Sequence, residues 1–206
     1  MSSSNQFAVV TGASSGIGLE LAKQFAINGF DLLITSESEA IESAAQEIKF
    51  LGANVETVRA DLSTRDGVHT LYSCIQASGR PVDAIAINAG IGVGGPFTET
   101  DIDDEIKMID LNVTSSVHLA KHVVRDMVAR GSGKILITSS IASTMPDPFE
   151  AVYGATKTFL QSFALALRNE LKDTGVSVTS LMPGPTETNF FHRAAGRYTR
   201  RTKQKG

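Results

Sequence analysis

The alternation of two hydrophobic patterns along the chain constrains its fold more than any other feature. Short runs of strand-forming residues alternate with longer segments whose apolar residues recur at helical spacing. Five helical segments separate the six predicted strands, which cover residues 7–11, 31–35, 54–60, 84–88, 134–139 and 176–181. This order favours right-handed βαβ crossovers, and therefore a parallel sheet with helices on both faces.

The composition of these runs is consistent with one domain. The strand cores VV, LLI, AIAI and ILI are almost entirely apolar, as expected of strands that are covered on both sides. A chain of 206 residues with 42% hydrophobic content can bury a substantial core, and no internal repeat or low-complexity linker divides it. We therefore predict a single doubly wound α/β domain, over residues 1–192, built on a parallel sheet of about six strands.

Charge and hydropathy exclude several function classes. The net charge of -3 gives no electrostatic reason to expect a nucleic acid or an anionic membrane as partner. No apolar run reaches the ~18 residues of a membrane span, and the N-terminal segment lacks a signal-peptide pattern, so we expect a cytoplasmic location. Cys74, the only cysteine, cannot form an internal disulfide and is expected to be a packing residue.

A glycine-rich turn follows the first predicted strand and opens a helix over residues 16–28. Gly12 permits a tight turn, Gly16 lets the backbone approach a pyrophosphate, and Gly18 lets helix and strand pack closely. The spacing differs from the G-x-G-x-x-G fingerprint, and a glycine-rich loop alone can be a plain turn. The strand–turn–helix context favours dinucleotide binding.

Tyr153 and Lys157 lie four residues apart in a predicted helix over residues 150–171, and so on one face of it. A phenol with its ordinary pKa near ~10 is almost never ionised at neutral pH. An ammonium one turn away favours the phenolate and could lower that pKa by a few units. Taken alone, such a pair more often forms a half-exposed stripe with a solvated tip.

Two further clusters are interpreted as structural. His118 and His122 have the spacing of metal ligands, but Leu119 stands where a zincin has glutamate and no third ligand is evident, so no metal site is predicted. The acidic residues between positions 99 and 105 lie at the start of the same helix, where carboxylates complement the helix dipole.

Several motifs together resemble the short-chain dehydrogenase/reductase family, over residues 5–191. They occur in the order and spacing of that family: TGxxxGxG at Thr11–Gly18, Asp61 after strand three, NAG at Asn88–Gly90, Asn112, Ser140, YxxxK at Tyr153–Lys157, and PG at Pro183-Gly184. The resemblance implies a Rossmann-like fold and NAD(P)-dependent interconversion of an alcohol and a carbonyl.

The resemblance assigns catalytic roles to four residues. Tyr153 would be the general acid or base, and Lys157 would lower its pKa and hold the nicotinamide ribose. Ser140 would hydrogen-bond the substrate oxygen, and Asn112 would complete the proton path. Between apolar neighbours in a helix, Asn112 indicates a specific hydrogen-bonding task, and a solvent-facing polar residue is the alternative.

A larger set would contact the cofactor. Asp61 would lie beside the adenine and Asn88–Gly90 beside the ribose, although either could be an ordinary strand-end cap. Thr186 and Thr188 would hold the nicotinamide carboxamide, or simply cap a helix. The full predicted set is Gly12, Ser14, Ser15, Gly16, Ile17, Gly18, Ser36, Glu37, Asp61, Leu62, Asn88, Ala89, Gly90, Tyr153, Lys157, Pro183, Gly184, Thr186 and Thr188.

The choice between NAD and NADP is open. The family uses an aspartate at the end of strand two for NAD, and a basic residue just after it or in the glycine turn for NADP. This chain has Ser36, Glu37 and Ser15 at those places. With no Lys or Arg in residues 35–40 to attract a 2′-phosphate, we expect a slight preference for NAD.

The loops expected to contact the substrate are apolar. Residues 141–152 and 185–191 contain no Lys or Arg to clamp an anion. We expect a neutral, fairly apolar ketone or secondary alcohol, contacted by Ile91, Val93, Phe97, Ile141, Met145, Phe149, Phe190 and Phe191. The alternatives are a non-catalytic dinucleotide-binding protein on the same fold, or an inactive C-terminally truncated chain.

Residues 193–206 form a basic tail without a strand-like run. Family members continue from this point into a seventh strand, so we expect the tail to be disordered or non-native and the seventh strand to be missing. The resemblance also implies a homodimer or homotetramer, in which the helices carrying Asn112 and Tyr153 pack against their copies.

Overall fold

The computed structural model describes residues 5–184. The strands are β1 Gln6–Thr11, β2 Phe30–Ser36, β3 Val55–Arg59, β4 Ala84–Ile87, β5 Gly133–Thr138 and β6 Val176–Leu181. The helices are α1 Gly16–Ile27, α2 Ile41–Lys49, α3 Arg65–Ala77, α4 Ile102–Ile109, α5 Ser115–Arg130 and α6 Ala151–Glu170, with a π-helical turn η1 Asp110–Thr114 and a 3₁₀ turn η2 Ile141–Ser143. The predicted roles of Thr186, Thr188, Phe190 and Phe191, and the basic tail, lie outside the described residues.

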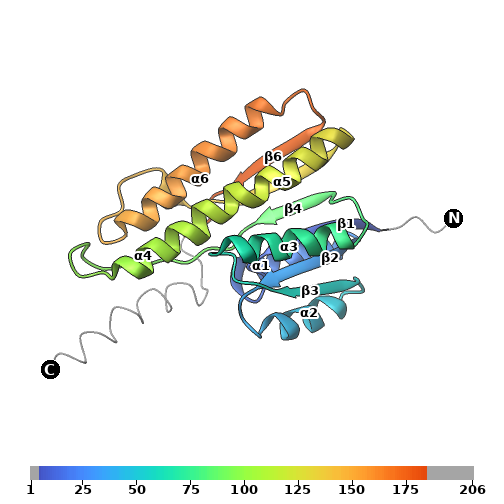
Figure 1. Ribbon diagram of the computed structural model, residues 1–206, viewed down its shortest axis with the longest axis horizontal. Helices are drawn as coiled ribbons and strands as arrows, with labels where there is room; N and C mark the ends of the chain where they lie inside the picture. Colours follow the sequence, from blue (N-terminus) through green and yellow to red (C-terminus); the bar gives the residue numbers. More distant parts are fainter. Residues whose placement is uncertain (1–4, 185–206) are drawn as a thin grey trace.

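The described strands form one parallel sheet in the order β3-β2-β1-β4-β5-β6. The chain moves outward from β1 to β3 and then crosses to β4 on the other side of β1, which is the doubly wound arrangement predicted from the sequence (Figure 1). Strand four ends one residue earlier than predicted. The reason is that the Asn88 backbone N–H donates to the side chain of Thr11 at 2.9 Å.

Helices cover both faces of the sheet. Side chains of α1 and α2 pack on one face in a cluster that contains Ala22, Ile41 and Ile48. A larger cluster on the other face unites α3, α5 and α6 through Leu71, Val123, Leu160 and their neighbours. Cys74 packs against this larger cluster, which confirms its predicted packing role.

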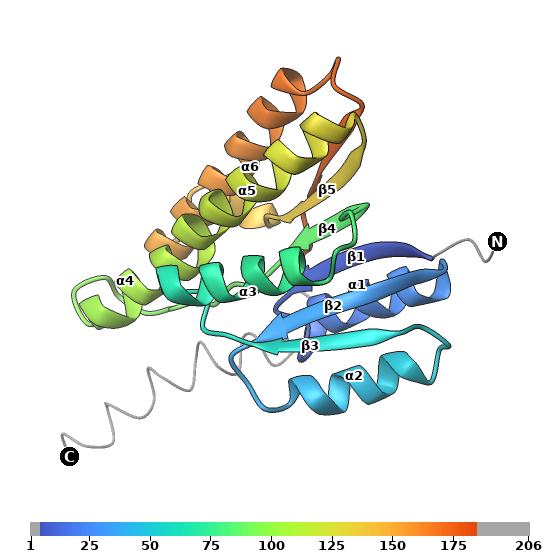
Figure 2. The same ribbon diagram turned by 45° about the vertical axis from the view of Figure 1, so that its right-hand side comes forward.

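Helices α4 and α5 form one long rod, joined by the π turn and lying beside α6 (Figure 2). Asp101 caps the start of the rod, where its side chain accepts a 2.9 Å hydrogen bond from the Asp103 N–H. Asp103, Asp104 and Glu105 follow in the first turn, so the acidic run lies at the helix N-terminus, as predicted.

Among the residues that the structure describes, no helix combines the length and the apolar character needed to cross a lipid bilayer.

The glycine turn brings β1, α1 and β4 into close contact. Gly12 has a positive φ of 69°, which a side chain would strain. At Gly18 the constraint is contact: a Cβ would lie 2.2 Å from the Gly12 carbonyl oxygen and 2.6 Å from the Asn88 side-chain nitrogen. The role predicted for Gly18, close packing of helix and strand, is confirmed.

Gly18→Ala should therefore destabilise the fold by about 3 kcal/mol or more, because the clashing backbone oxygen cannot move freely. Urea denaturation followed by circular dichroism measures this change. Gly29→Ala is the matched control, since Gly29 has a φ of 81° but open space around it, and about 1 kcal/mol is expected there. Equal losses in the two variants would mean that the contact at Gly18 is not tight.

Candidate active site

The carboxyl ends of β1, β4 and β5 meet the first turns of α6 and bring the predicted catalytic residues together. Tyr153 and Lys157 lie in the first two turns of α6 and are only 7% and 5% exposed. Ser140 lies two residues after the end of β5, and its side chain hydrogen-bonds the Tyr153 side chain. The alternative of a half-exposed stripe is therefore excluded.

The environment of Tyr153 is apolar and acidic. Its side chain packs in a small buried cluster with Val93 and Met108. Burial raises the pKa of the phenol, the hydrogen bond from Ser140 opposes that rise, and the carboxylates of Glu150 and Asp147 add to it. The net shift is upward. The expectation that Lys157 lowers this pKa is thus not met in the structure.

Lys157 is a buried cation with few partners. Burial lowers its pKa to about 8 from an ordinary value of 10.5. Its ammonium donates a 3.1 Å hydrogen bond to the Thr138 carbonyl, the one acceptor for it among the described residues, and lies 5.7 Å from the centre of the Tyr153 ring. An ammonium has three N–H donors. Two of them are therefore available to a ligand.

Asn112 lies in the π turn and is fully buried. Its amide nitrogen donates to the Ile91 carbonyl and the Thr156 hydroxyl, both at 3.0 Å, and its oxygen accepts from the Ile91 N–H at 3.0 Å. This excludes the solvent-facing alternative and shows the specific hydrogen-bonding task inferred from its apolar neighbours. Asn112 ties the loop after β4 to α6, and π turns often occur at functional positions.

Asn88 acts mainly as a strand-end clamp. Its side-chain nitrogen donates to the Thr11 carbonyl at 3.1 Å, and its side-chain oxygen accepts from the Thr138 hydroxyl at 3.1 Å. The amide therefore joins β1, β4 and β5, as in the strand-end alternative, and the place of Asn88–Gly90 beside a ribose stays a prediction. Gly90 instead borders the site, since a Cβ there would lie 3.6 Å from the Lys157 ammonium nitrogen.

The glycine turn fits the diphosphate of a dinucleotide. Ser15 is the N-cap of α1, but its side chain accepts no capping hydrogen bond, and the first turn carries no acidic residue. The first N–H groups of α1, from Gly16 and Ile17 onward, thus remain available to an anion. Together with the spare donors of Lys157, they form a site that could hold a dinucleotide.

Two other predicted cofactor residues have clear structural tasks. Burial acts to raise the pKa of Asp61, but hydrogen bonds from Ser63 and the positive charge of Lys107 hold it below its usual value. Leu62 packs its side chain into the larger core, so only its backbone can face a ligand.

At the other end of the predicted set, the Pro183 carbonyl accepts a 3.1 Å hydrogen bond from the Ile141 N–H. This bond places Pro183 and Gly184 beside the loop after β5.

Two cations missed by the sequence analysis lie at the end of β2. Arg59 pairs in register with Ser36, donates to the Glu37 carbonyl at 3.2 Å and forms a 2.8 Å ion pair with Glu39. Lys107 from α4 lies 3.4 Å from the Glu37 carboxylate. Ser36 itself hydrogen-bonds the Ser14 hydroxyl at 3.0 Å. The parallel pairing of β2 with β3 was the signal that could have identified Arg59.

Two hollows flank the start of α6. One, of about 300 Å³, is bordered by residues of the loop after β5, including Met145 and Asp147. The other, of about 200 Å³, is lined by Val93, Phe97 and Phe149 among others. Tyr153 lines neither hollow. Three of the predicted substrate contacts are thus brought together in one hollow, and Met145 lies in the other.

The chain matches known proteins over most of its length. A family model described as short chain dehydrogenase matches residues 6–198. An uncharacterized oxidoreductase, YmfI, of Bacillus subtilis (strain 168) is 33% identical over 192 residues, which cover 92% of this chain and 78% of that protein. The NADP-dependent 3-hydroxy acid dehydrogenase YdfG of Salmonella typhimurium (strain LT2) is 34% identical over 178 residues, or 85% of this chain and 71% of that protein.

Among solved structures, a short-chain dehydrogenase from Sphingobium yanoikuyae in complex with NADPH superposes with a TM-score of 0.87. It is 29% identical in sequence, and the match covers 92% of this chain and 75% of that one.

The buried ammonium yields a stability prediction for Lys157→Met. The drop in the Lys157 pKa from 10.5 to about 8 means that burying the ammonium destabilises the folded wild-type chain by about 3 kcal/mol. The variant escapes this cost, but it loses the hydrogen bond to Thr138, which is worth about 1 kcal/mol. We expect the variant to be more stable by about 2 kcal/mol at pH 7. Urea denaturation measures this, with Lys49→Met on the exposed face of α2 as the neutral control.

The same variant has a distinctive pH dependence. Below pH 8 both the folded and the unfolded wild-type chains keep the proton on Lys157, so the full cost of burial applies. Between about pH 8 and pH 10.5 the unfolded chain binds more protons, and this group then makes the wild-type protein more stable as pH rises. The advantage of Lys157→Met should shrink over that range. A constant advantage would contradict the assigned pKa.

Proposed function

The chain belongs to the short-chain dehydrogenase family, enzymes that act on CH–OH groups with NAD or NADP, and from this premise we propose an NADP-dependent interconversion of a secondary alcohol and a ketone. The substrate proposed is neutral and fairly apolar, and Tyr153 is the proposed general acid and base. The observation that carries the proposal is the pair of buried side chains Tyr153 and Lys157, with the half-buried Ser140 hydrogen-bonded to Tyr153.

The reaction needs a hydride donor or acceptor, which a bound nicotinamide supplies. In the direction of reduction, the Tyr153 hydroxyl gives its proton to the substrate oxygen as negative charge develops there, and the Ser140 hydroxyl donates a hydrogen bond to the same oxygen. In oxidation, the Tyr153 phenolate removes the hydroxyl proton. The raised pKa of Tyr153 keeps the phenol protonated at physiological pH, which is the form that donates the proton in reduction.

Lys157 is proposed to hold the ribose next to the nicotinamide. Its two spare N–H donors are buried and have no acceptor among the described residues, so a pair of ribose hydroxyls would satisfy them. Gly90 lets the loop after β4 pass close to Lys157, since a Cβ there would lie 3.0 Å from the Asn112 side-chain oxygen and 3.6 Å from the ammonium nitrogen. Asn112 supports this arrangement indirectly, because its two hydrogen bonds to the Ile91 backbone fix the loop after β4.

NADP is the proposed cofactor. The slight preference for NAD expected from the sequence is not supported, since YdfG is named an NADP-dependent enzyme and the Sphingobium structure holds NADPH. Arg59 is the proposed partner of the 2′-phosphate, because it lies beside Ser36 in the sheet and its guanidinium is exposed at that edge. Lys107 neutralises Glu37, which would otherwise repel a phosphate.

The proposed neutrality of the substrate rests on charge. Asp147 borders the larger hollow, and Glu150 lies next to it with a pKa raised by burial and by Asp147. Carboxylates beside this hollow repel an anionic substrate. Val93, Phe97 and Phe149 offer apolar contact in the smaller hollow.

A homodimer or homotetramer is the proposed assembly. Phe159 and Leu165 on α6 and Val128 on α5 expose between 38% and 44% of their surface, and Ile102 and Ile106 on α4 expose more. A second copy of the same helices would cover these apolar side chains.

Tyr153→Phe tests the proton-transfer role. Turnover of a neutral ketone with NADPH should fall by about a hundredfold to ten-thousandfold, since proton transfer by a positioned side chain contributes about 10²–10⁴-fold. The affinity for NADPH should stay within a few-fold, because the hydroxyl adds little binding surface. Tyr72→Phe, which removes a hydroxyl bound to Asp126 on another face, is the control.

Fixed-time assays measure the turnover of Tyr153→Phe, and fluorescence titration measures its affinity for NADPH, so the two expectations are tested separately. Full activity of Tyr153→Phe would refute the assignment. Binding of NADPH by the wild-type chain without turnover of any carbonyl in a broad panel would instead favour the non-catalytic dinucleotide-binding protein.

Arg59→Gln tests the cofactor assignment. Removing a cation that pairs with a phosphate should raise the dissociation constant for NADPH by about tenfold or more, while NADH binding changes by no more than a few-fold. Lys49→Gln removes a different exposed cation and should leave both affinities unchanged. If Arg59→Gln alters NADH and NADPH binding equally, the 2′-phosphate contacts another residue.

A further inference from the structure

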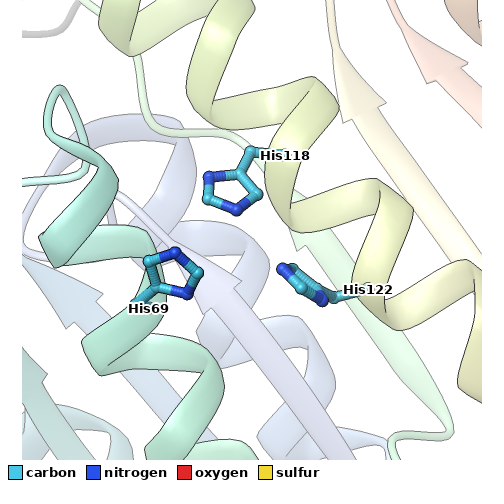
Figure 3. Close-up of side chains that lie close together, drawn as sticks. All are labelled: His69, His118 and His122. Carbon is cyan, nitrogen blue, oxygen red and sulfur yellow. The ribbon is translucent and has the colours of Figure 1, made fainter.

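Three histidines gather on the sheet face opposite α1 and α2, away from Tyr153. His69 comes from α3, and His118 and His122 come from α5 (Figure 3). One ring nitrogen from each lies within 4.8 Å of the others. The sequence analysis found no third ligand for His118 and His122. That premise is wrong, because α3 packs beside α5 and contributes His69 from far away in the sequence.

We propose that His69, His118 and His122 form a binding site for a divalent transition-metal ion of the kind that imidazole ligates, with Zn²⁺ as the ion to test. Three histidines are an established ligand set for Zn²⁺, and the fourth tetrahedral position then belongs to solvent. Imidazole also suits Cu²⁺ and Ni²⁺.

The geometry permits ligation after small side-chain rotations. Zn–N bonds of about 2.0–2.1 Å in a tetrahedron place the nitrogens about 3.4 Å apart, so the ligand atoms must approach by roughly 1.5 Å or less. His69 is exposed and the other two are half-buried, which leaves the rings room to turn. In the part of the chain that is described, none of the three imidazoles forms a hydrogen bond that would have to break.

Neighbouring side chains orient the cluster. Tyr72 stacks on His122 with ring centres 4.3 Å apart, and its hydroxyl donates a 2.9 Å hydrogen bond to Asp126. Gln76 donates to the same carboxylate at 3.2 Å. The ring of His122 is thus held on the α3 side of α5, where it faces His69.

The charges around the cluster act in both directions. Asp126 places a carboxylate one turn beyond His122, whereas Arg65 lies close enough to act electrostatically on His118. Burial, the other two histidines and Arg65 lower the pKa of His118.

A metal held in this way would bridge α3 and α5. Because it binds the folded chain and not the unfolded one, it would raise the thermal stability, and the gain grows with the logarithm of the free metal concentration above Kd. The site uses none of the residues assigned to catalysis, so the inference stands apart from the proposed oxidoreductase activity.

The test uses the full 206-residue chain, freed of metal with EDTA and titrated with Zn²⁺ against a chromophoric chelator. His69→Ala, His118→Ala and His122→Ala are compared with His192→Ala, which removes the remaining histidine of the sequence. We expect one ion per chain, and each of the first three variants should weaken binding by more than about tenfold, the lower bound for losing even an outer-sphere partner.

A thermal melt gives the second measurement. Zn²⁺ should raise the melting temperature of the wild type and of His192→Ala, EDTA should reverse this, and His69→Ala should show no shift. His69→Gln, which keeps a polar side chain, replaces the alanine variant if that one loses helicity.

His69 decides the outcome, because His118 and His122 alone could bind Zn²⁺ as a simple surface pair. Binding that depends only on those two, or only on His192, overturns the proposal. The absence of saturable Zn²⁺ binding by the wild-type chain overturns it as well.

Discussion

The buried ammonium of Lys157 is the interaction on which the arrangement of the site depends. A cation placed among β5, the loop after β4 and α6 is costly unless its surroundings are fixed. The Thr138 carbonyl accepts one of its hydrogen bonds, Ser139 anchors the Lys157 backbone carbonyl at 2.9 Å, and Asn112 holds the loop that passes beside it. These hydrogen bonds therefore connect the neighbouring strand ends, the π turn and the start of α6 around Lys157.

The fold could be predicted because its signals are local. Hydrophobic periodicity and turn residues can be recognised within a dozen positions. They were enough for the order and type of the elements, and for approximate bounds of the strands and of the helices over residues 16–28 and 150–171. The position of Tyr153 and Lys157 on one helical face follows from the same periodicity. Gly18 was predictable for a related reason, since the sequence itself places it in the first turn of the helix that follows β1.

The rest depends on contacts between distant segments. Arg59 reaches Glu37 only because β3 pairs with β2 in a particular register, and His69 reaches His118 only because α3 packs beside α5. The predicted decrease in the pKa of Tyr153 is not met for the same reason. A pairwise argument with Lys157 predicts a downward shift, but burial and the carboxylates of Glu150 and Asp147 raise the pKa, and the hydrogen bond from Ser140 only partly opposes them.

The rod formed by α4, the π turn and α5 serves two regions with different chemistry, and helical geometry explains how. The π turn carries Asn112, whereas α5 carries His118 and His122 at positions that lie on a different side of the rod. Asn112 therefore faces α6 and the loop after β4, whereas His118 and His122 face α3. Since the two sets of side chains leave the rod on different sides, a ligand at the histidine cluster need not displace Asn112. One helix can thus fix the geometry around Lys157 and also present a separate set of imidazoles to its neighbour.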